Sequence, residues 1–394
     1  MPRGWVRSDL DLWSEAVLAD PLPAFRALRD AGPAVWLERH GVLALPRHAE
    51  VRAALADWEA FSSAAGVSVS PEVNAARQPN ILESDPPEHD ELRRTLASQL
   101  SAPCLAPERD RLAAIARELV DAALARTADG AFDGAADLAR PYSLRVVSDL
   151  LGLPEEGRSG LPELAERAFN LMGPTNERSL DGLEAVTEIF RHAFAVARSG
   201  CLAPGSKGAE LVAGGEADKI AAYTWPGIDT TVLGVAAALH LFARHPDQWA
   251  LVREDPALAG PAFAEALRLH TPVKHFSRLT TGDVSWAGLD IPAGTRVLVM
   301  YGSANRDERR YADPDRFDVT RNPTDHLGFG RGIHLCVGIH LARLEASVLL
   351  AELVARVERF EEAGPPRWLV NNTLHGLASL PLRAVPAATG PSSG

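Results

Sequence analysis

The residues best suited to chemistry lie in a glycine-rich run near the end of the chain. Residues 329–338 have the sequence FGRGIHLCVG, and a helical pattern follows from about Gly338. Glycine lets a backbone adopt unusual dihedral angles and approach a neighbouring group closely. Cys336 therefore lies in a loop that can pass close to a bound group, and the following helix N-terminus would stabilise an anionic sulfur.

Three other interpretations of this run follow from its residue types. A buried structural cysteine beside a glycine-rich turn is the common role of an isolated cysteine. A dinucleotide-binding loop would need a βαβ unit around the glycines, and the surrounding pattern predicts none. A Cys/His metal site from His334, Cys336 and His340 lacks the remaining ligands of a zinc site.

Two further groups of residues precede the cysteine run. Glu265 and Arg268 stand three apart in a helical stretch, so they share one face of a helix. Pro226 lies inside another helical stretch, which we expect to kink because proline cannot donate to the carbonyl four residues back. Asp229 and Thr230 follow it and place an acid beside an alcohol.

These motifs are carried by elements with clear periodicity. Apolar residues recur at spacings of three and four along most of the chain, as in amphipathic helices. Helices are predicted over residues 107–125, 143–153, 180–198 and 214–245. Strands are predicted over residues 34–37, 42–45, 283–286, 296–301 and 379–382. The pattern indicates a helix-dominated body with a small β-rich corner.

Composition and charge are those of an ordinary soluble globular chain. Of the 394 residues, 46% are hydrophobic and 23% are charged, and the net charge of −12 argues against nucleic acid or an anionic membrane as a partner. The longest apolar stretch, residues 232–243, falls short of the roughly 20 residues that cross a bilayer. Because residues 1–5 lack the apolar core of a signal peptide, we expect a cytoplasmic protein.

No linker or charge block divides the chain. We therefore expect a single domain over residues 1–386, followed by a disordered tail or cloning remnant over residues 387–394. Cys104 and Cys201 are too scattered for a disulfide framework, so we interpret them as free thiols in a reducing compartment.

In their order and spacing, the motifs resemble the haem-thiolate monooxygenases, the cytochrome P450 family, from about residue 21 to residue 385. The resemblance implies a mainly α fold with a small β-rich lobe, and haem b between the distal and proximal long helices. It implies an oxidoreductase that inserts one oxygen atom of O2 into an organic substrate and releases the other as water. Cys336 would be the metal ligand, since a thiolate favours O–O cleavage.

The resemblance also assigns site residues. Asp229 and Thr230 match the family's acid–alcohol pair for proton delivery, and Pro226 departs from the alanine or glycine usual at its position. Glu265 and Arg268 would form a structural network with Arg316, in the segment before the cysteine loop. The propionates would be held by His89, Arg93, Arg278 and His334. The full cofactor-binding set is His89, Arg93, Gly227, Arg278, Phe329, His334, Cys336 and Gly338.

The substrate is predicted from a narrower resemblance. Residues 61–67, 302–307 and 371–377 resemble the bacterial subgroup that demethylates or hydroxylates para-substituted benzoic acids. This implies a small aromatic substrate such as an aryl methyl ether, with a larger natural product as the alternative. Residues 221–222 are both alanine where that subgroup has an Arg-Ser pair, and the loop of residues 74–80 is one residue shorter. The predicted substrate residues are Arg77, Asn80, Tyr223, Trp225, Thr373 and Leu374.

Redox partners and rival activities complete the expectations. Electrons from NAD(P)H would arrive through a small acidic ferredoxin and its reductase, which would meet a basic face that includes Arg93, Arg94 and Arg331. A peroxide-driven haem-thiolate enzyme would usually replace the acid–alcohol pair, so Asp229 and Thr230 argue against it. A non-catalytic haem sensor would need no proton relay and would normally carry a signalling module.

Overall fold

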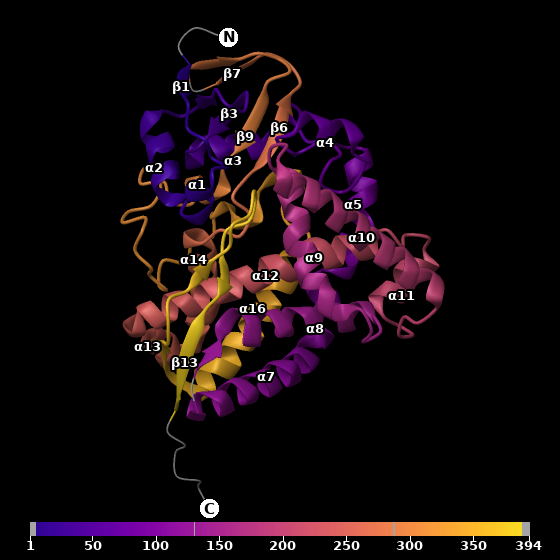
Figure 1. Cartoon of the computed structure of the whole chain (residues 1–394), viewed down its shortest axis with the longest axis vertical. Helices are drawn as coiled ribbons and strands as arrows, with labels where there is room; N and C mark the ends of the chain where they lie inside the picture. The colour runs from indigo at the N-terminus through magenta and orange to yellow at the C-terminus, as the bar shows by residue number, and fades with distance from the viewer. Residues whose placement is uncertain (1–4, 130, 287, 388–394) are drawn as a thin grey trace, which may run out of the picture.

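The computed structural model describes residues 5–129, 131–286 and 288–387. It shows a helical body with a smaller β-rich part, which lies at the top of Figure 1 beside the N-terminus. The predicted tail of residues 387–394 lies outside the described residues from residue 388 onward, as do residues 1–4 at the N-terminus. The predicted mainly α architecture is confirmed.

Three of the four longest helices described cross the body: α7 (Arg109–Asp129), α12 (Lys219–Arg244) and α16 (Ile339–Arg356). The other helices are α1 (Glu15–Ala19), α2 (Leu22–Ala31), α3 (His48–Ala56), α4 (Pro71–Ala76), α5 (Glu88–Gln99), α6 (Ala102–Leu105), α8 (Arg140–Leu151), α9 (Leu161–Ala168), α10 (Glu177–Ser199), α11 (Lys207–Ala213), α13 (Pro246–Glu254), α14 (Ala259–Leu269) and α15 (Tyr301–Ala304). Short helical turns used below are η4 (Phe169–Met172), η6 (Leu327–Phe329) and η7 (Gly332–His334).

The largest sheet is mixed and has the strand order β1-β2-β3-β9-β6-β4. Its strands are β1 (Val6–Ser8), β2 (Val35–Leu37), β3 (Val42–Leu45), β4 (Phe61–Ser62), β6 (Phe276–Thr280) and β9 (Arg296–Val299). A second sheet, β10-β13-β5, joins β10 (Val357–Glu362), β13 (Pro381–Pro386) and β5 (Phe132–Asp133). Two further pairs are β7 (Val284–Trp286) with β8 (Leu289–Ile291), and β11 (Arg367–Trp368) with β12 (Leu377–Ser379).

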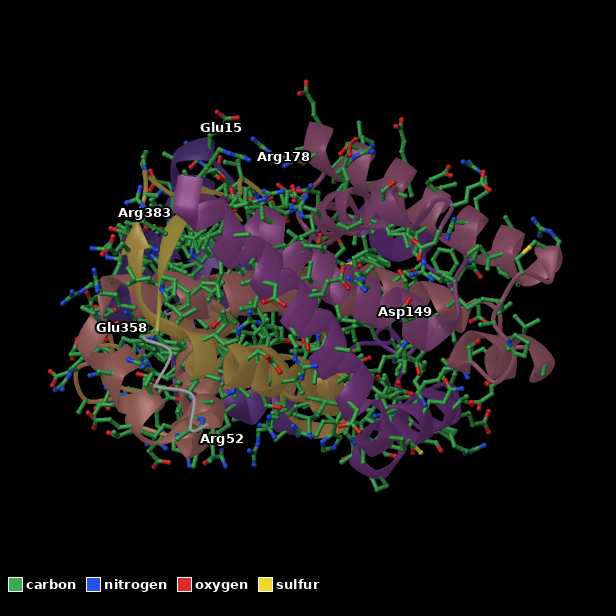
Figure 2. All side chains as sticks on the ribbon, turned by 90° about the horizontal axis from the view of Figure 1, so that it is seen from below. Glu15, Arg52, Asp149, Arg178, Glu358 and Arg383 are labelled. Carbon is green, nitrogen blue, oxygen red and sulfur yellow. The ribbon has the colours of Figure 1, made fainter. Side chains whose placement is uncertain are left out.

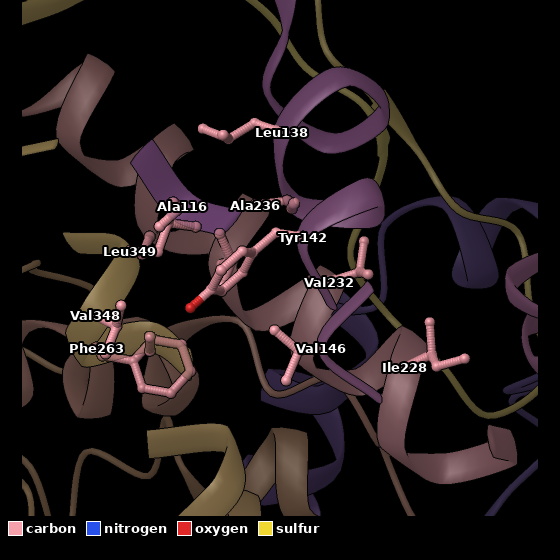
Figure 3. Close-up of a cluster of buried hydrophobic side chains, with 14 of the residues drawn as sticks. Ala116, Leu138, Tyr142, Val146, Ile228, Val232, Ala236, Phe263, Val348 and Leu349 are labelled. Atoms are coloured by element: carbon pink, nitrogen blue, oxygen red, sulfur yellow. The ribbon is translucent and has the colours of Figure 1, made fainter. Parts of the chain in front are cut away.

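Helix α12 is the centre of the main core. Figure 3 shows its side chains Ile228, Val232 and Ala236 facing Tyr142 and Val146 of α8, with residues of α7, α14 and α16 closing the cluster. The helix is buried along most of its length because α8, α9, α14 and α16 pack around it. Each large apolar side chain buried in this way contributes roughly 1.5–3 kcal/mol to folding.

The predicted elements agree with the structure where the three- and four-residue spacing of apolar residues extends over several helical turns. Helices predicted over residues 107–125, 143–153 and 180–198 correspond to α7, α8 and α10. The stretch predicted as one helix over residues 214–245 instead divides into α11 and α12, because Gly215 adopts a φ of 76° that ends the helical path. The strand predicted over residues 379–382 divides into β12 and β13.

Helix α12 is long and apolar enough to cross a bilayer by length and composition, with a hydropathy of 1.3, but 78% of that window is buried inside the protein. It is therefore a core helix. It also remains helical through Pro226, because the assigned helix runs unbroken from Lys219 to Arg244. The helix that was predicted to kink at this proline is therefore continuous through it.

Charged side chains cover the outside of the helical body (Figure 2). Arg178 of α10 pairs with Glu15 of α1 at 2.8 Å, and both are visible at the edge of that view. Exposed pairs of this kind contribute little to stability, at most about 1 kcal/mol. Burial of the apolar core therefore contributes most of the stability of the fold, and the charged side chains form its solvent-facing surface.

Candidate active site

The Cys336 loop is closed by its own backbone. The Cys336 N–H donates to the Phe329 carbonyl at 2.8 Å. Gly330 and Gly332 have φ angles of 69° and 71°, which residues with a side chain rarely adopt. A Cβ at Gly332 would also overlap the Leu55 carbonyl oxygen at the end of α3. Glycine is therefore required at position 332 by the close approach of the loop to α3.

The surroundings of Cys336 determine whether its sulfur is protonated. Cys336 is half-buried, whereas Cys104 and Cys201 are exposed. Burial raises the pKa of the Cys336 thiol, while the Gly338 backbone and the Arg93 guanidinium act in the opposite direction. The protein alone therefore favours the neutral thiol, and a metal cation bound at the sulfur would reverse that balance.

Four of the predicted cofactor residues meet beside this loop. The rings of His89 and His334 lie 4.7 Å apart between centroids in a T-shaped arrangement. Arg93 donates to the Leu335 carbonyl at 2.5 Å. Arg278 is buried and donates to the Ser277 carbonyl at 2.7 Å. Burial and the Arg278 guanidinium lower the pKa of His334 to about 3.

The predicted acid–alcohol pair lies in the middle of α12. Asp229 is 3% exposed, and its Oδ2 atom has no hydrogen-bond partner among the residues described. Burial raises the pKa of Asp229 well above its usual range, and Glu166 adds to this effect while Arg140 opposes it. Thr230 is half-buried, and its hydroxyl donates to the Pro226 carbonyl at 2.7 Å. Asp229 therefore favours its protonated form, and it lies next to an alcohol that is hydrogen-bonded back to its own helix.

Gly227 leaves space on α12 beside this pair. A Cβ added there would meet only Val147 Cγ2 within 4 Å, at 3.9 Å, within the described part of the chain. Steric crowding by the protein therefore does not explain glycine here. The open space is consistent with the small-ligand site expected from the sequence.

The structural network differs from the prediction in its third member. Glu265 and Arg268 are both 0% exposed and form a bidentate pair, with Arg268 Nε 2.7 Å from Glu265 Oε2 and Nη2 2.8 Å from Oε1. The second guanidinium on Glu265 belongs to Arg321, at 3.0 Å. Arg316 is exposed and offers only its backbone carbonyl to Arg268, at 3.4 Å.

The prediction for Arg316 was therefore wrong at the level of the side chain. The segment before residue 316 crosses Arg268 with its backbone, and the Pro314 carbonyl accepts from Arg268 Nη1 at 2.7 Å. This directs the Arg316 side chain outward. A turn with Asn322 at a φ of 44° follows, and Arg321 beside it reaches Glu265.

The predicted substrate residues fall into two groups. Trp225, Leu374 and Thr373 are gathered near η4 and β6: Trp225 and Leu374 join the same apolar cluster, and the Thr373 side chain is buried. Tyr223 instead donates its hydroxyl to Gln99 of α5 at 2.9 Å, which ties α12 to α5.

Arg77 and Asn80 are engaged in holding their own loop. Arg77 donates to the carbonyls of Ala64 and Asn74. The Asn80 side chain donates to Glu83 at 2.7 Å and accepts from the Leu82 N–H at 2.9 Å. Neither side chain is brought against the Trp225 cluster by a contact that the structure describes.

Comparison with known proteins identifies the family to which this chain belongs. The family model described as Cytochrome P450 matches residues 260–381. The chain is 43% identical over 390 residues to cytochrome p450 CYP199A2 of Rhodopseudomonas palustris (strain ATCC BAA-98 / CGA009), an alignment that covers 96% of this chain and 94% of that protein. The chain belongs to the cytochrome P450 family.

Two other matches span nearly the whole cytochrome P450 chain. Cytochrome P450-terp of Pseudomonas sp is 30% identical and is aligned over 92% of both proteins. The crystal structure of CYP108D1 from Novosphingobium aromaticivorans DSM12444 superposes with a TM-score of 0.81 at 28% identity, over 95% of this chain and 97% of that one. The protein is a cytochrome P450 monooxygenase, an oxidoreductase that uses haem b and electrons from NAD(P)H passed on by redox partners.

The residues around Cys336 fit haem in this cytochrome P450. The Nε2 atoms of His89 and His334 are buried, and neither has a hydrogen-bond partner within the described residues, so both suit an external acceptor such as a propionate. In the same part of the chain, no group of three or more His, Cys, Asp or Glu side chains is placed to hold a metal ion. A metal at Cys336 would thus take one protein ligand, which suits iron already held by a porphyrin.

One buried acid of the cytochrome P450 core was missed from the sequence. Glu345 of α16 is fully buried, and neither carboxylate oxygen has a hydrogen-bond partner in the residues that the structure describes. Burial raises the pKa of Glu345 well above its usual range, and the nearby Ser143 hydroxyl opposes this only in part. That hydroxyl donates to the Ile228 carbonyl at 3.3 Å, directly beside Asp229. A charged residue on the apolar face of the helix, beside Leu341 and Val348, was the available signal.

Proposed function

We propose that this cytochrome P450 oxidises a small aromatic substrate, and that Cys336 would be the one protein residue bound to the iron of haem b. The observation that supports this best is the position of a single half-buried cysteine beside two buried, unpaired imidazole nitrogens of the described residues. His89, Arg93, Arg278 and His334 would hold the propionates, and Phe329, Gly227 and Gly338 would border the porphyrin. When bound, haem supplies the activation of dioxygen and the transfer of one oxygen atom.

The protein would deliver protons through α12. Asp229 holds a proton on its buried carboxyl group, because its pKa is raised by burial. Thr230 can turn its hydroxyl from the Pro226 carbonyl toward the ligand side of the helix, since this i to i−4 bond is weak and replaceable. The pair would thereby transfer protons inward while the apolar core excludes bulk water.

The aromatic substrate class is supported by the side chains near α12. Trp225 lies among Phe169, Leu171, Met172 and Phe276, which offer a largely aromatic and apolar contact surface. The 43% identity to CYP199A2 agrees with the subgroup suggested by residues 61–67, 302–307 and 371–377. Hydroxylation or O-demethylation of an aryl compound is the activity proposed, and a larger natural-product substrate is the second candidate.

The electron donors proposed are a small acidic ferredoxin and its reductase. Arg94 and Arg331 are exposed near the Cys336 loop, and Arg93 lies beside it, so a basic patch exists on an acidic protein. Opposite charge steers such transient partners together. We place the protein in the cytoplasm, where those partners and NAD(P)H are found.

The ligand assignment is tested by Cys336→His. The variant should retain haem but lose the strongly red-shifted Soret band of the reduced carbon monoxide complex, because that band requires a thiolate ligand. Persistence of the band in a variant with normal haem content would disprove the assignment.

The substrate class is tested by spin-state titration with 4-methoxybenzoate, a methoxyphenol and a macrolide. A response to the macrolide alone would exclude the aromatic class.

A further inference from the structure

The partly exposed positions of α12 define one face of an otherwise buried helix. Ala222, Trp225, Pro226 and Thr230 are half-buried or exposed, whereas most of their neighbours on α12 are buried. Ala222, Pro226 and Thr230 follow one another at spacings of four, and Trp225 is three after Ala222, so these residues cover one broad side of the helix, with Trp225 and Thr230 at its two edges. Trp225 is the largest side chain on this face and stands just over one turn before Thr230.

The Trp225 ring is fixed on its flanks by apolar side chains. Its centroid lies 5.9 Å from that of Phe169 of η4, in a T-shaped arrangement. Phe276 of β6 packs in the same two apolar clusters as Trp225, together with Leu171 and Met172. These contacts hold the indole in one orientation against η4 and β6.

The indole nitrogen of Trp225 is the polar group in this setting. Its Nε1 atom is buried, and no residue that the structure describes accepts its hydrogen bond. A buried donor without an acceptor is unfavourable, and an indole N–H can only donate. A ligand oxygen placed against the ring would satisfy it.

Three cationic side chains close to these segments already hold backbone carbonyls, and Arg278 of β6 is assigned to a propionate. Arg77 binds the carbonyls of Ala64 and Asn74. Arg296 donates to the Gly66 carbonyl at 2.7 Å, and Lys274 donates to the Asn371 carbonyl at 2.7 Å. A carboxylate buried beside Trp225 would therefore lack a free cation and would lose its hydration without compensation.

We propose that the Trp225 indole N–H donates a hydrogen bond to an oxygen of the substrate, and that this residue selects an uncharged aromatic carbonyl compound, such as an aryl ketone or ester, over an aryl carboxylate. The inference rests on the proposed small aromatic substrate and specifies its polar group. Trp225 is thus a specificity residue, and the alanines at 221 and 222 remain consistent with it because they supply no charge.

The unmodified holoenzyme gives the first test, without any risk of misfolding. Spin-state titrations and calorimetry compare 4-methoxyacetophenone, 4-isopropenylanisole and 4-methoxybenzoate. The first two have the same shape, but only the ketone carries the carbonyl acceptor. The ketone should bind about three- to tenfold more tightly than the alkene, the range expected for one neutral hydrogen bond. The benzoate should bind more weakly than the ketone.

Trp225→Phe then locates the donor. It keeps an aromatic ring and removes the N–H, so the preference for ketone over alkene should fall to about onefold while alkene affinity changes little. Phe169→Leu is the matched control, because it changes the packing of the same indole and keeps the N–H. It should weaken both ligands and preserve their ratio.

The outcomes separate the two levels of the proposal. Equal binding of ketone and alkene by the unmodified enzyme, or an unchanged ratio in Trp225→Phe, would overturn the role of Trp225 and leave the aromatic substrate class intact. Tighter binding of the benzoate than of the ketone would overturn the preference for uncharged ligands. Failure of all three aromatic compounds, with a response to a macrolide, would instead reject the proposed function.

Discussion

Two buried carboxyl groups, Asp229 of α12 and Glu345 of α16, belong to the helices on either side of Ser143. Asp229 and Glu345 both have pKa values raised by burial, and Ser143 lies between the second acid and the Ile228 carbonyl. A neutral carboxyl group can donate a proton, which an ionised one cannot do. The proposed proton delivery therefore has a physical basis in burial, because burial raises both pKa values and favours the protonated acids.

Thr230→Ala should uncouple oxygen consumption from product formation. Without the hydroxyl, the protein would no longer hold a proton donor at this position of α12, so hydrogen peroxide should rise at the expense of product per NAD(P)H consumed. The measurement is the ratio of product to reductant. Thr187→Ala is the control, because its hydroxyl makes the same i to i−4 bond, to the Leu183 carbonyl at 2.8 Å, on exposed α10. Equal coupling in the two variants would remove Thr230 from the mechanism.

Asp229→Asn should slow turnover while haem content stays normal. The amide has nearly the shape of the acid but carries no transferable proton, and losses of roughly 10²–10⁴-fold are typical when such a group is removed. The rate of product formation and its solvent deuterium isotope effect would be measured with a saturating substrate. A variant as fast as the unmodified enzyme would show that protons arrive by another route.

At the scale of single residues, the sequence predicted the groups that belong to short motifs. Cys336, Asp229 and Thr230 could be proposed as site residues because neighbouring residue types constrain them. Glu345 was missed because its surroundings come from α8 and α12, more than a hundred residues earlier. From the local sequence, such a residue is visible only as a charged residue on the apolar face of a helix, and its burial cannot be predicted.

At the scale of elements, the Glu265–Arg268 pair fastens the segment before the cysteine loop to α14. Arg268 donates to the carbonyls of Asn305 and Pro314 at 2.8 and 2.7 Å, so one guanidinium holds backbone from two places. A buried pair of this kind is valuable mainly as a clamp, because its desolvation cost offsets much of its attraction.

Arg321→Ala and Arg316→Ala should therefore behave differently. Removing Arg321 takes away the second cation on buried Glu265, so we expect a loss of about 1–3 kcal/mol in the free energy of unfolding, with weaker haem retention. Removing the exposed Arg316 side chain should change it by less than about 0.5 kcal/mol. Chemical denaturation and haem transfer to apomyoglobin measure both. An equal effect would restore the original assignment of Arg316.

The elements themselves were predictable where periodicity is long and local. Helices α7, α8 and α10 show three- and four-residue spacing over many turns. Strands β4 and β5 have only two residues each and exist through pairing with β6 and β13, so no local signal predicted them. Likewise, Arg321 reaches Glu265 through a turn at Asn322, and turn geometry of this kind is not specified by spacing.

At the scale of the whole molecule, several histidines are buried as neutral rings. Burial lowers the pKa of His375 to about 3, and the charges of Lys274 and Arg306 lower it further. Burial also lowers the pKa of His240 to about 4 and that of His270 well below its usual value. In the unfolded chain these groups would titrate near 6.5. The unfolded state therefore binds more protons below that pH, and stability is lost as pH falls from about 6.5 toward 4.

His375→Phe tests this linkage at one ring. His375 stacks on Trp368 with centroids 4.8 Å apart, and neither ring nitrogen has a hydrogen-bond partner among the described residues, so phenylalanine should replace it with little loss. A histidine that stays neutral in the folded state costs about 2 kcal/mol at pH 5 relative to neutral pH. The drop in unfolding free energy between pH 7 and pH 5, measured by denaturant titration of the holoenzyme, should shrink by about that amount. Trp368→Phe alters the same stack without altering titration, so its pH dependence should match that of the unmodified protein. A drop unchanged in His375→Phe would mean that this histidine takes up its proton without unfolding.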